Sequence, residues 1–156
     1  MKLIEDSRQQ AGKHELKHAY WVANGDDILR CKLPFGDYAL PPKVAVDTKE
    51  NMGEIANNIG GAEHRRFRDE CKLAQEYDCQ LYVLVENTEG ILSLEDVARW
   101  VNPRLQYSPK AISGPRLQRA MQTMQSRYGV RFLFCRPEEA AATVNKLLEE
   151  GEHGRD

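Results

Sequence analysis

The segment spanning residues 36–49 restricts the fold of this chain more than any other stretch. Its sequence, GDYALPPKVAVDTK, predicts two short strands joined by a turn at Pro41 and Pro42. Because side chains alternate between the two faces of a strand, the β-branched residues of the second strand share one face, which suits a core. The opposite face then presents Asp47 and Lys49, a carboxylate and an ammonium two residues apart.

Two carboxylates that converge on one point repel each other unless a cation lies between them. Asp37 in the first strand is expected to meet Asp47 in the second, and hard oxygen ligands of this kind suit Mg²⁺ or Mn²⁺. A metal held in this way can supply a hydroxide and neutralise charge on a phosphate group. Lys49 would then contact the attacking water or the phosphate. The spacing D-x(9)-D-x-K is typical of PD-(D/E)XK nucleases, although an exposed hairpin with solvated charges fits the same residues.

Length and composition indicate one domain of an ordinary globular protein. The chain has 156 residues, of which 41% are hydrophobic and 29% charged, and this is enough for a sizeable core. No apolar run is long enough to cross a bilayer, and the acidic N-terminus lacks the apolar stretch of a signal peptide. We therefore expect a cytoplasmic protein with no membrane partner. The net charge of −2 argues against coating of nucleic acid by bulk electrostatics, but it allows a local basic face.

The four cysteines favour buried thiols in a reducing compartment over zinc ligands or disulfides. They are Cys31, Cys71, Cys79 and Cys135. No pair has the short spacing of a zinc site, and Cys31 and Cys135 fall inside strand-like apolar runs.

Hydrophobic periodicity predicts the remaining elements. Strands are expected at residues 2–5, 27–33, 81–85 and 130–135, and helices at residues 12–23, 50–59, 63–77, 94–101, 115–128 and 137–150. The first helix is expected to bury Leu16, Ala19, Tyr20 and Ala23, and residues 102–113 are expected to form a mobile surface loop. Because strands alternate with helices after an antiparallel opening, we expect an α/β fold with a mixed sheet.

The segment from His14 to His18 reads H-E-x-x-H, the signature of zinc proteases. The spacing places both histidines on one helical face, and Glu15 would be the base. However, Lys17 would place a cation beside the zinc, and no third ligand follows at a usual spacing. We therefore expect these histidines to lie at a solvated helix edge.

Taken in order, the motifs resemble the nuclease domain of the XPF/MUS-type structure-specific endonucleases, a branch of the restriction-endonuclease-like superfamily. The resemblance covers about 150 residues. The matching segments are residues 5–9 (EDSRQ, where the family has VDxRE), 36–38 (GDY), 46–49 (VDTK, for VERK), 65–67 (RRF), 84–86 (LVE) and 128–148 (the closing strand and helix).

The resemblance implies a restriction-endonuclease-like mixed sheet flanked by helices on both faces. Residues 1–150 would form the nuclease domain and residues 151–156 a disordered tail. It also implies hydrolysis of DNA phosphodiester bonds, in branched or structured DNA, with Mg²⁺ or Mn²⁺ as cofactor and DNA repair as a setting. Because the helix-hairpin-helix pair of the family is missing from this sequence, we expect an excised domain or a stand-alone bacterial or viral form.

The resemblance also implies roles for individual residues. The metal would be held by Asp37, Asp47 and the backbone carbonyl of Thr48, while Asp6 would reach it directly or through water. Lys49 would orient the nucleophilic water.

Basic residues would contact the DNA. Arg8 and Arg65 are expected near the scissile phosphate. The helix at residues 63–77 carries a basic stripe that is either a track for the DNA backbone or a solvated face paired with neighbouring acids; its members are Arg65, Arg66, Arg68 and Lys72. In the family the last two helices form a dimer interface, so a homodimer is expected through them.

Three departures from the family pattern keep a second hypothesis open. Asp47 replaces a Glu, Thr48 replaces the Arg of the signature, and Gln9 replaces a Glu. The acidic residue expected four places beyond Lys49 falls at Gly53. These losses reduce the charge around the metal, so the alternative is a catalytically silent relative that binds DNA or a partner chain as a scaffold.

Overall fold

Six strands form a single mixed sheet at the centre of the molecule. The structure is a computed structural model that describes residues 2–10, 12–33, 35–40 and 43–153. The strands are β1 (Lys2–Asp6), β2 (Asp27–Cys31), β3 (Tyr38–Leu40), β4 (Val44–Lys49), β5 (Gln80–Glu86) and β6 (Arg131–Cys135). Their order is β2-β1-β3-β4-β5-β6, in which β3 is antiparallel to both neighbours and the other pairs are parallel.

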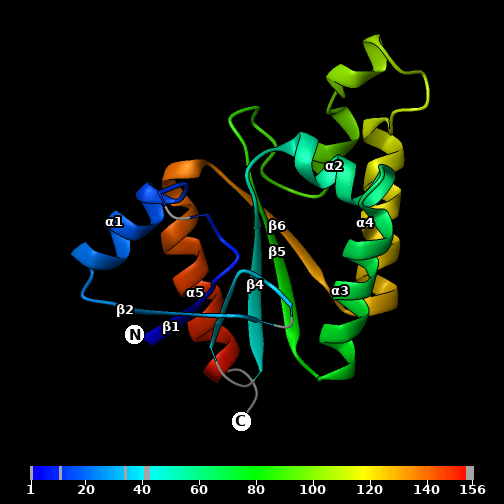
Figure 1. The fold of residues 1–156 in the computed structure, drawn as a ribbon. Coiled ribbons are helices and arrows are strands. Elements are labelled where there is room, and N and C mark those ends of the chain that lie inside the picture. Colours follow the sequence, from blue (N-terminus) through cyan, green and yellow to red (C-terminus); the bar gives the residue numbers. More distant parts are fainter. Residues whose placement is uncertain (1, 11, 34, 41–42, 154–156) are drawn as a thin grey trace.

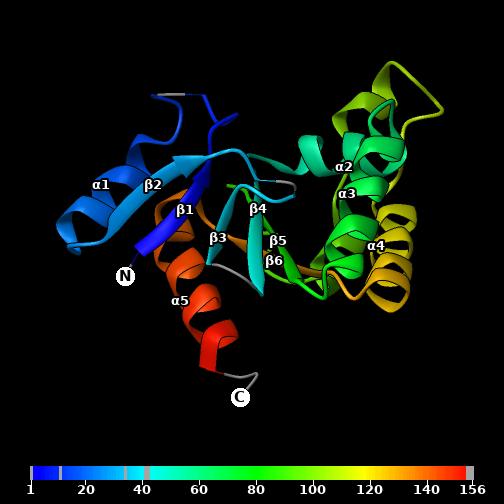
Figure 2. The same ribbon diagram turned by 60° about the horizontal axis from the view of Figure 1, so that its bottom comes forward.

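Helices cover both faces of this sheet. They are α1 (Glu15–Ala23), α2 (Met52–Gly60), α3 (His64–Glu76), α4 (Gly114–Tyr128) and α5 (Ala140–His153), with short 3-10 helices η1 (Glu95–Arg99), η2 (Pro103–Gln106) and η3 (Pro137–Glu139). Figures 1 and 2 show α2, α3 and α4 on one side of the sheet and α1 and α5 on the other. The expected α/β fold, a mixed sheet flanked by helices on both faces, is confirmed. Within the described ranges, no helix combines the length and apolarity needed to cross a membrane.

Strand β4 separates two hydrophobic cores, and all six of its residues are buried. Ala45 packs into the core under α2, α3 and α4, whereas Val44 and Val46 pack into the core that α5 covers. Full burial of one such side chain contributes about 1.5–3 kcal/mol. The next strand, β5, is also buried on both faces, since the neighbouring residues Val83 and Leu84 are both completely inaccessible.

Helix α4 has nearly the bounds expected for the helix at residues 115–128, and residues at its two ends explain them. The Ser113 side chain accepts a hydrogen bond from the Arg116 N–H at the start of α4, and Gly129 ends this helix in the left-handed region at φ 72°. The expected helix at residues 94–101 is only the 3-10 helix η1, and the expected loop at 102–113 contains η2.

Two smaller expectations concern the cysteines and the C-terminus. Cys71 and Cys135 are buried thiols, and burial raises the pKa of Cys135 to about 12. The side chain of Cys31, the turn at residues 41–42 and residues 154–156 lie outside the described residues. Helix α5 continues to His153, so it extends into the segment expected to be a tail.

Helix α1 faces the opposite way from the sequence prediction, which was wrong. Leu16 is 65% exposed and Tyr20 37%, while Lys17 and Trp21 are buried. The Trp21 indole N–H donates to the Asn145 side chain of α5 at 2.7 Å. Polar partners at the sheet therefore decide which face of α1 is buried, and the apolar periodicity does not.

The two histidines of the H-E-x-x-H segment differ in their surroundings. His14 is buried, which corrects the expected solvated edge, and His18 Nε2 lies 2.7 Å from a carboxylate oxygen of Glu5. Burial, followed by the charge of Lys17, lowers the pKa of His14. The two rings therefore serve α1 packing and not a zinc site.

A buried ion pair fastens α1 to the sheet. Lys17 Nζ lies 2.6 Å from Glu86 Oε2, and both side chains are less than a tenth exposed. We predict that Lys17→Met lowers the free energy of unfolding by about 3–5 kcal/mol, because it leaves a carboxylate buried without its partner. Urea unfolding followed by circular dichroism measures the change.

A double substitution separates the pair from simple packing damage. Lys17→Met combined with Glu86→Leu is expected to recover most of the loss, since no unpaired charge remains. Arg136→Met removes the exposed pair with Glu139 and is expected to change stability by less than about 1 kcal/mol. Equal losses in the single and double Lys17 variants would contradict the assignment.

Candidate active site

The pairing of β3 with β4 brings the two central carboxylates together. Tyr38 lies opposite Val46 in the antiparallel register, so the next pair places Asp37 opposite Asp47. The Asp37 N–H donates to the Val46 carbonyl at 2.8 Å, and the Asp37 carbonyl accepts from the Asp6 N–H at 2.6 Å. The backbone of Asp37 is therefore fixed between β1 and β4.

The residue before Asp37 must be a glycine. Gly36 has φ +75°, and a Cβ at this position would lie 3.1 Å from the Cβ of Ala45. The Gly36 N–H donates to Glu70 Oε1 on α3 at 2.7 Å. This turn thus brings the backbone against the sheet and links it to α3.

Asp37 and Asp47 form a crowded carboxyl pair. One carboxylate oxygen of Asp37, Oδ2, accepts from the Thr48 N–H at 2.6 Å and from the Thr48 hydroxyl at 3.1 Å. Burial, the negative charge of Asp47 and a hydrogen bond between the two carboxyl groups raise the pKa of Asp37 well above its usual range. The two carboxyl groups therefore resist being ionised together, and a cation bound between them would relieve this.

Lys49 points into the same site and not into the apolar interior. Its Nζ lies 3.0 Å from Asp47 Oδ2 and 5.1 Å from the centre of the Phe67 ring. Burial alone would lower the pKa of Lys49, but the carboxylates of Asp47, Glu70 and Asp37 raise it above its usual value. The neighbouring carboxylates therefore favour the charged form of Lys49.

These side chains line one open cleft with a volume of about 620 Å³. The five residues expected to be catalytic all contribute to its wall; they are Asp6, Arg8, Asp37, Asp47 and Lys49. The sequence prediction that these residues meet in space agrees with this geometry.

Asp6 is already engaged within the protein. Its Oδ2 accepts from Arg8 Nε at 2.7 Å, and its Oδ1 accepts from the Leu33 N–H at 3.2 Å. A second contact joins Arg8 to the Leu33 carbonyl at 2.8 Å. In this arrangement Asp6 holds the Arg8 side chain on the wall of the cleft.

The basic residues of α3 are divided between the cleft and the outer surface. Arg66 lines the cleft, where it lies 3.9 Å from Glu63, while Arg65 and Lys72 are exposed outside the described lining. Arg68 is half-buried, and its Nε is buried without a hydrogen-bond partner among the described residues.

Glu70 is a site residue that sequence reasoning missed. It lines the cleft, and burial followed by the charge of Asp47 raises its pKa to about 7. In the sequence it is one of several acidic residues on a highly charged helix. The only sequence feature that distinguishes Glu70 is that it precedes Cys71, one of the buried residues of α3.

The donor set fits a divalent cation held by a few protein oxygens and by water. Half-buried Asp37 and buried Asp47 lie opposite each other, and Asp47 Oδ2 lacks a well-aligned hydrogen bond although Lys49 is near. Within the described ranges, no group of three or more acidic, histidine or cysteine side chains converges on one point. Mg²⁺ keeps several waters and needs only one or two carboxylates, so the pair meets its requirements.

The raised pKa of Glu70 predicts a pH-dependent stability. A carboxyl whose pKa is about 7 in the folded protein and 4.5 without perturbation destabilises the fold as pH rises through that window, since the folded state binds the proton more tightly. In metal-free buffer, Glu70→Gln should therefore match the wild type near pH 4.5 and be more stable by about 2 kcal/mol above pH 7.

Urea titrations across this pH range test the prediction. Glu76→Gln removes an exposed carboxylate of the same helix and should show no such divergence. If the two Gln variants behave alike, Glu70 is not the group that titrates.

Comparison with solved structures places this fold among known proteins. No family model matches the sequence, and no curated protein matches it. The structure is similar to that of XPF from Aeropyrum pernix, with a TM-score of 0.69 and 17% identity over 98% of this chain. It is also similar to XPF from Aeropyrum pernix in complex with DNA, with a TM-score of 0.69 and 18% identity over 99% of this chain. The chain spans 66% of the length of those proteins. It therefore has an XPF-like nuclease-domain fold, as the sequence motifs predicted.

Proposed function

We propose that this chain is a metal-dependent DNA endonuclease that hydrolyses phosphodiester bonds in branched or structured DNA. The observation that carries the proposal is the placement of Asp37 opposite Asp47 across β3 and β4 on the wall of one open cleft, with Lys49 Nζ 3.0 Å from Asp47 Oδ2. Two carboxylates and one ammonium in an open cleft form the set that hydrolysis of a phosphodiester with a divalent metal needs.

Each residue has a role that its position supports. Asp37 and Asp47 would hold Mg²⁺ or Mn²⁺, which supplies a hydroxide and neutralises the phosphate. Lys49 would orient the attacking water or bind a non-bridging phosphate oxygen, because the neighbouring carboxylates favour its charged form. Arg8 and Arg66, on the cleft wall, would hold the phosphate backbone of the substrate.

The carbonyl of Thr48 and the side chain of Asp6 remain candidate contacts to the metal. Thr48 lies between Asp47 and Lys49 in β4, and its N–H and hydroxyl donate to Asp37 Oδ2. Asp6 would reach the metal through a water, since both of its oxygens already accept hydrogen bonds.

DNA as the substrate draws support from the fold. One similar protein is XPF in complex with DNA. At 18% identity the two proteins share the fold, and the choice of DNA as substrate also depends on the shape and charge of the cleft. Its open shape and its three cations, Arg8, Lys49 and Arg66, would admit and hold a phosphate backbone.

A catalytically silent scaffold is the second candidate function. It is favoured by the small number of converging acidic side chains in the described part of the site and by Thr48 in place of a basic residue. Such a protein would bind DNA, or a partner chain, without cutting.

We also propose a homodimer through α4 and α5. Met121 of α4 and Leu148 of α5 are fully buried in the two cores of this chain, so the homodimer is proposed from the resemblance and not from an exposed apolar face. The expected result is a mass of two chains by light scattering after size-exclusion chromatography. A mass of one chain across the accessible concentration range would contradict the dimer.

The enzyme proposal predicts loss of cutting without loss of folding. With Mg²⁺ or Mn²⁺ and labelled fork, flap or bubble DNA, the wild type should cut. Asp47→Asn should cut at least about 100-fold more slowly, because the loss of one carboxylate ligand weakens metal binding and removes a negative charge from the site. Denaturing gel electrophoresis of the products measures the rate.

Controls distinguish the enzyme from the scaffold. Asp78→Asn and Glu76→Gln lie outside the cleft lining and should cut as the wild type does. DNA binding without cutting under both metals would support the scaffold and contradict the enzyme. Cutting that survives in both Asp37→Asn and Asp47→Asn would exclude this site as the catalytic centre.

A further inference from the structure

A long segment of the chain has no acidic residue at all. Residues 97–137 contain eight Lys and Arg residues and no Asp or Glu. Because the whole chain carries a net charge of −2, the other residues together carry −10. The near-neutral total therefore hides a strongly basic segment, which contains η2, the loop that follows it, and α4.

Most cations of this segment have no carboxylate partner. In the described part of the chain, Arg99 pairs with Asp96 and Arg136 with two glutamates, while the remaining six form no ion pair. On α4, three arginines recur near one face of the helix and are exposed: Arg116, Arg119 and Arg127. In α3, by contrast, basic residues alternate with acidic ones. The stronger basic surface is therefore on α4 and the loop before it.

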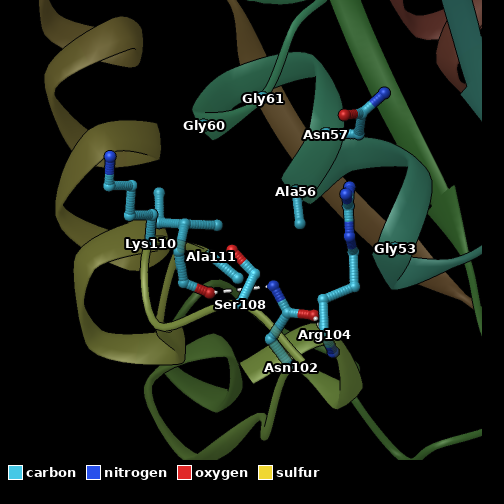
Figure 3. Close-up of a pocket in the computed structure, with 11 residues that line it drawn as sticks. Gly53, Ala56, Asn57, Gly60, Gly61, Asn102, Arg104, Ser108, Lys110 and Ala111 are labelled. Carbon is cyan, nitrogen blue, oxygen red and sulfur yellow. Dashed lines mark hydrogen bonds between the residues drawn. The ribbon is translucent and has the colours of Figure 1, made fainter. Parts of the chain in front are cut away.

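The loop at residues 101–112 forms a small pocket against α2, with a volume of about 140 Å³. This is several times the ~30 Å³ that one water occupies. Figure 3 shows Arg104 extending from the loop to end beside Gly53 and Ala56 of α2, while Lys110 lies on the other side of the pocket. Two cationic residues and Ser108 thus line a space large enough for an anion.

The pocket is rigid on its loop side. The Asn102 side chain accepts from the Arg104 N–H at 3.0 Å and donates to the Ile112 carbonyl at 2.9 Å, so it ties the two ends of the loop together (Figure 3). On the other side, Gly60 permits close packing, because a Cβ there would lie 2.8 Å from the Cβ of Ile112. A preorganised site of this kind loses little entropy on binding.

The pocket borders the active-site cleft. Asn57 of α2 lines both spaces, so one turn of helix separates them. Figure 1 shows the loop projecting from the end of the molecule at which β4 leads into α2. A strand of nucleic acid in the cleft can therefore continue across α2 to the loop.

The loop also exposes apolar side chains near the pocket. Tyr107 is 87% exposed and Val101 77%. Proteins that bind single-stranded nucleic acid combine exposed aromatic rings with cations that have no carboxylate partner. The ring stacks on a base and the cations hold the phosphates.

We propose that the pocket between α2 and the loop at residues 101–112 binds a backbone phosphate of DNA, and that Tyr107 stacks on an unpaired base next to it. This inference rests on the proposed DNA substrate and deepens it. It selects DNA with a single-stranded part near the cleavage point, such as a fork or a flap.

The test measures DNA binding in EDTA, where no cutting takes place. The probe is a fluorescent fork with one single-stranded arm, beside a plain duplex. Arg104→Ala combined with Lys110→Ala should weaken fork binding at least about tenfold, and should reduce the slope of log K against log[salt] by about 2, since two phosphate contacts are lost. Tyr107→Ala should weaken binding of the fork about fivefold or more and leave binding of the duplex unchanged.

The control is a double variant with the same change in charge. Lys43→Ala combined with Lys146→Ala removes two exposed cations that lie at the start of β4 and on α5, away from the pocket, and it should bind the fork as the wild type does. Urea unfolding verifies that every variant is folded. Equal binding losses in the two double variants, or an unchanged salt slope for the loop variant, would overturn the proposal.

The outcome is separate from that of the cutting assay. If the wild type cuts DNA but the loop variants bind and cut normally, this inference fails and the endonuclease stands. If nothing cuts but fork binding depends on Arg104, Lys110 and Tyr107, this inference stands and the chain is a scaffold.

Discussion

The site depends on the antiparallel pairing of β3 with β4, which holds two carboxyl groups against each other inside the fold. Asp37 and Asp47 cannot separate, because the backbone of Asp37 is bonded to both β1 and β4. Their repulsion raises the pKa of Asp37 and is a free-energy cost of the folded state in the absence of a cation. A cation bound between them would remove that cost, so metal binding and stability are coupled at this point.

The parts of the fold that sequence predicted are those decided by neighbours along the chain. The period of two in β4, the cap at Ser113 and the left-handed Gly129 depend on residues within a few positions. The face of α1 depends instead on contacts with distant residues: Trp21 bonds to Asn145, 124 positions away. A periodicity of apolar residues cannot report such partners, so it selected the wrong side of the helix.

The same distinction applies within the site. Asp37, Asp47 and Lys49 follow from one short motif whose geometry a hairpin fixes. Glu70 reaches the site only because α3 packs over β4 and because its carboxylate accepts from the Gly36 N–H. Nothing in its local sequence distinguishes it from Glu76, which is exposed. Its raised pKa is a product of tertiary structure, and only the structure reveals it.

Thr48 is the residue that departs most from the resembled signature, yet it donates two hydrogen bonds to the carboxylate of Asp37. An arginine at this position would add a full positive charge, whereas Thr48 provides two hydrogen bonds to one oxygen of Asp37. Hydrogen bonds to a charged group contribute about 1.5–3 kcal/mol, and the bond from the Thr48 backbone lowers the pKa of Asp37 against the effects of burial and Asp47. Only the hydroxyl bond is specific to threonine, since an arginine would keep the backbone N–H, so the substitution replaces a full positive charge with one neutral donor 3.1 Å from Asp37 Oδ2. The backbone bond favours the ionised form of Asp37, which is the form that a metal ion requires.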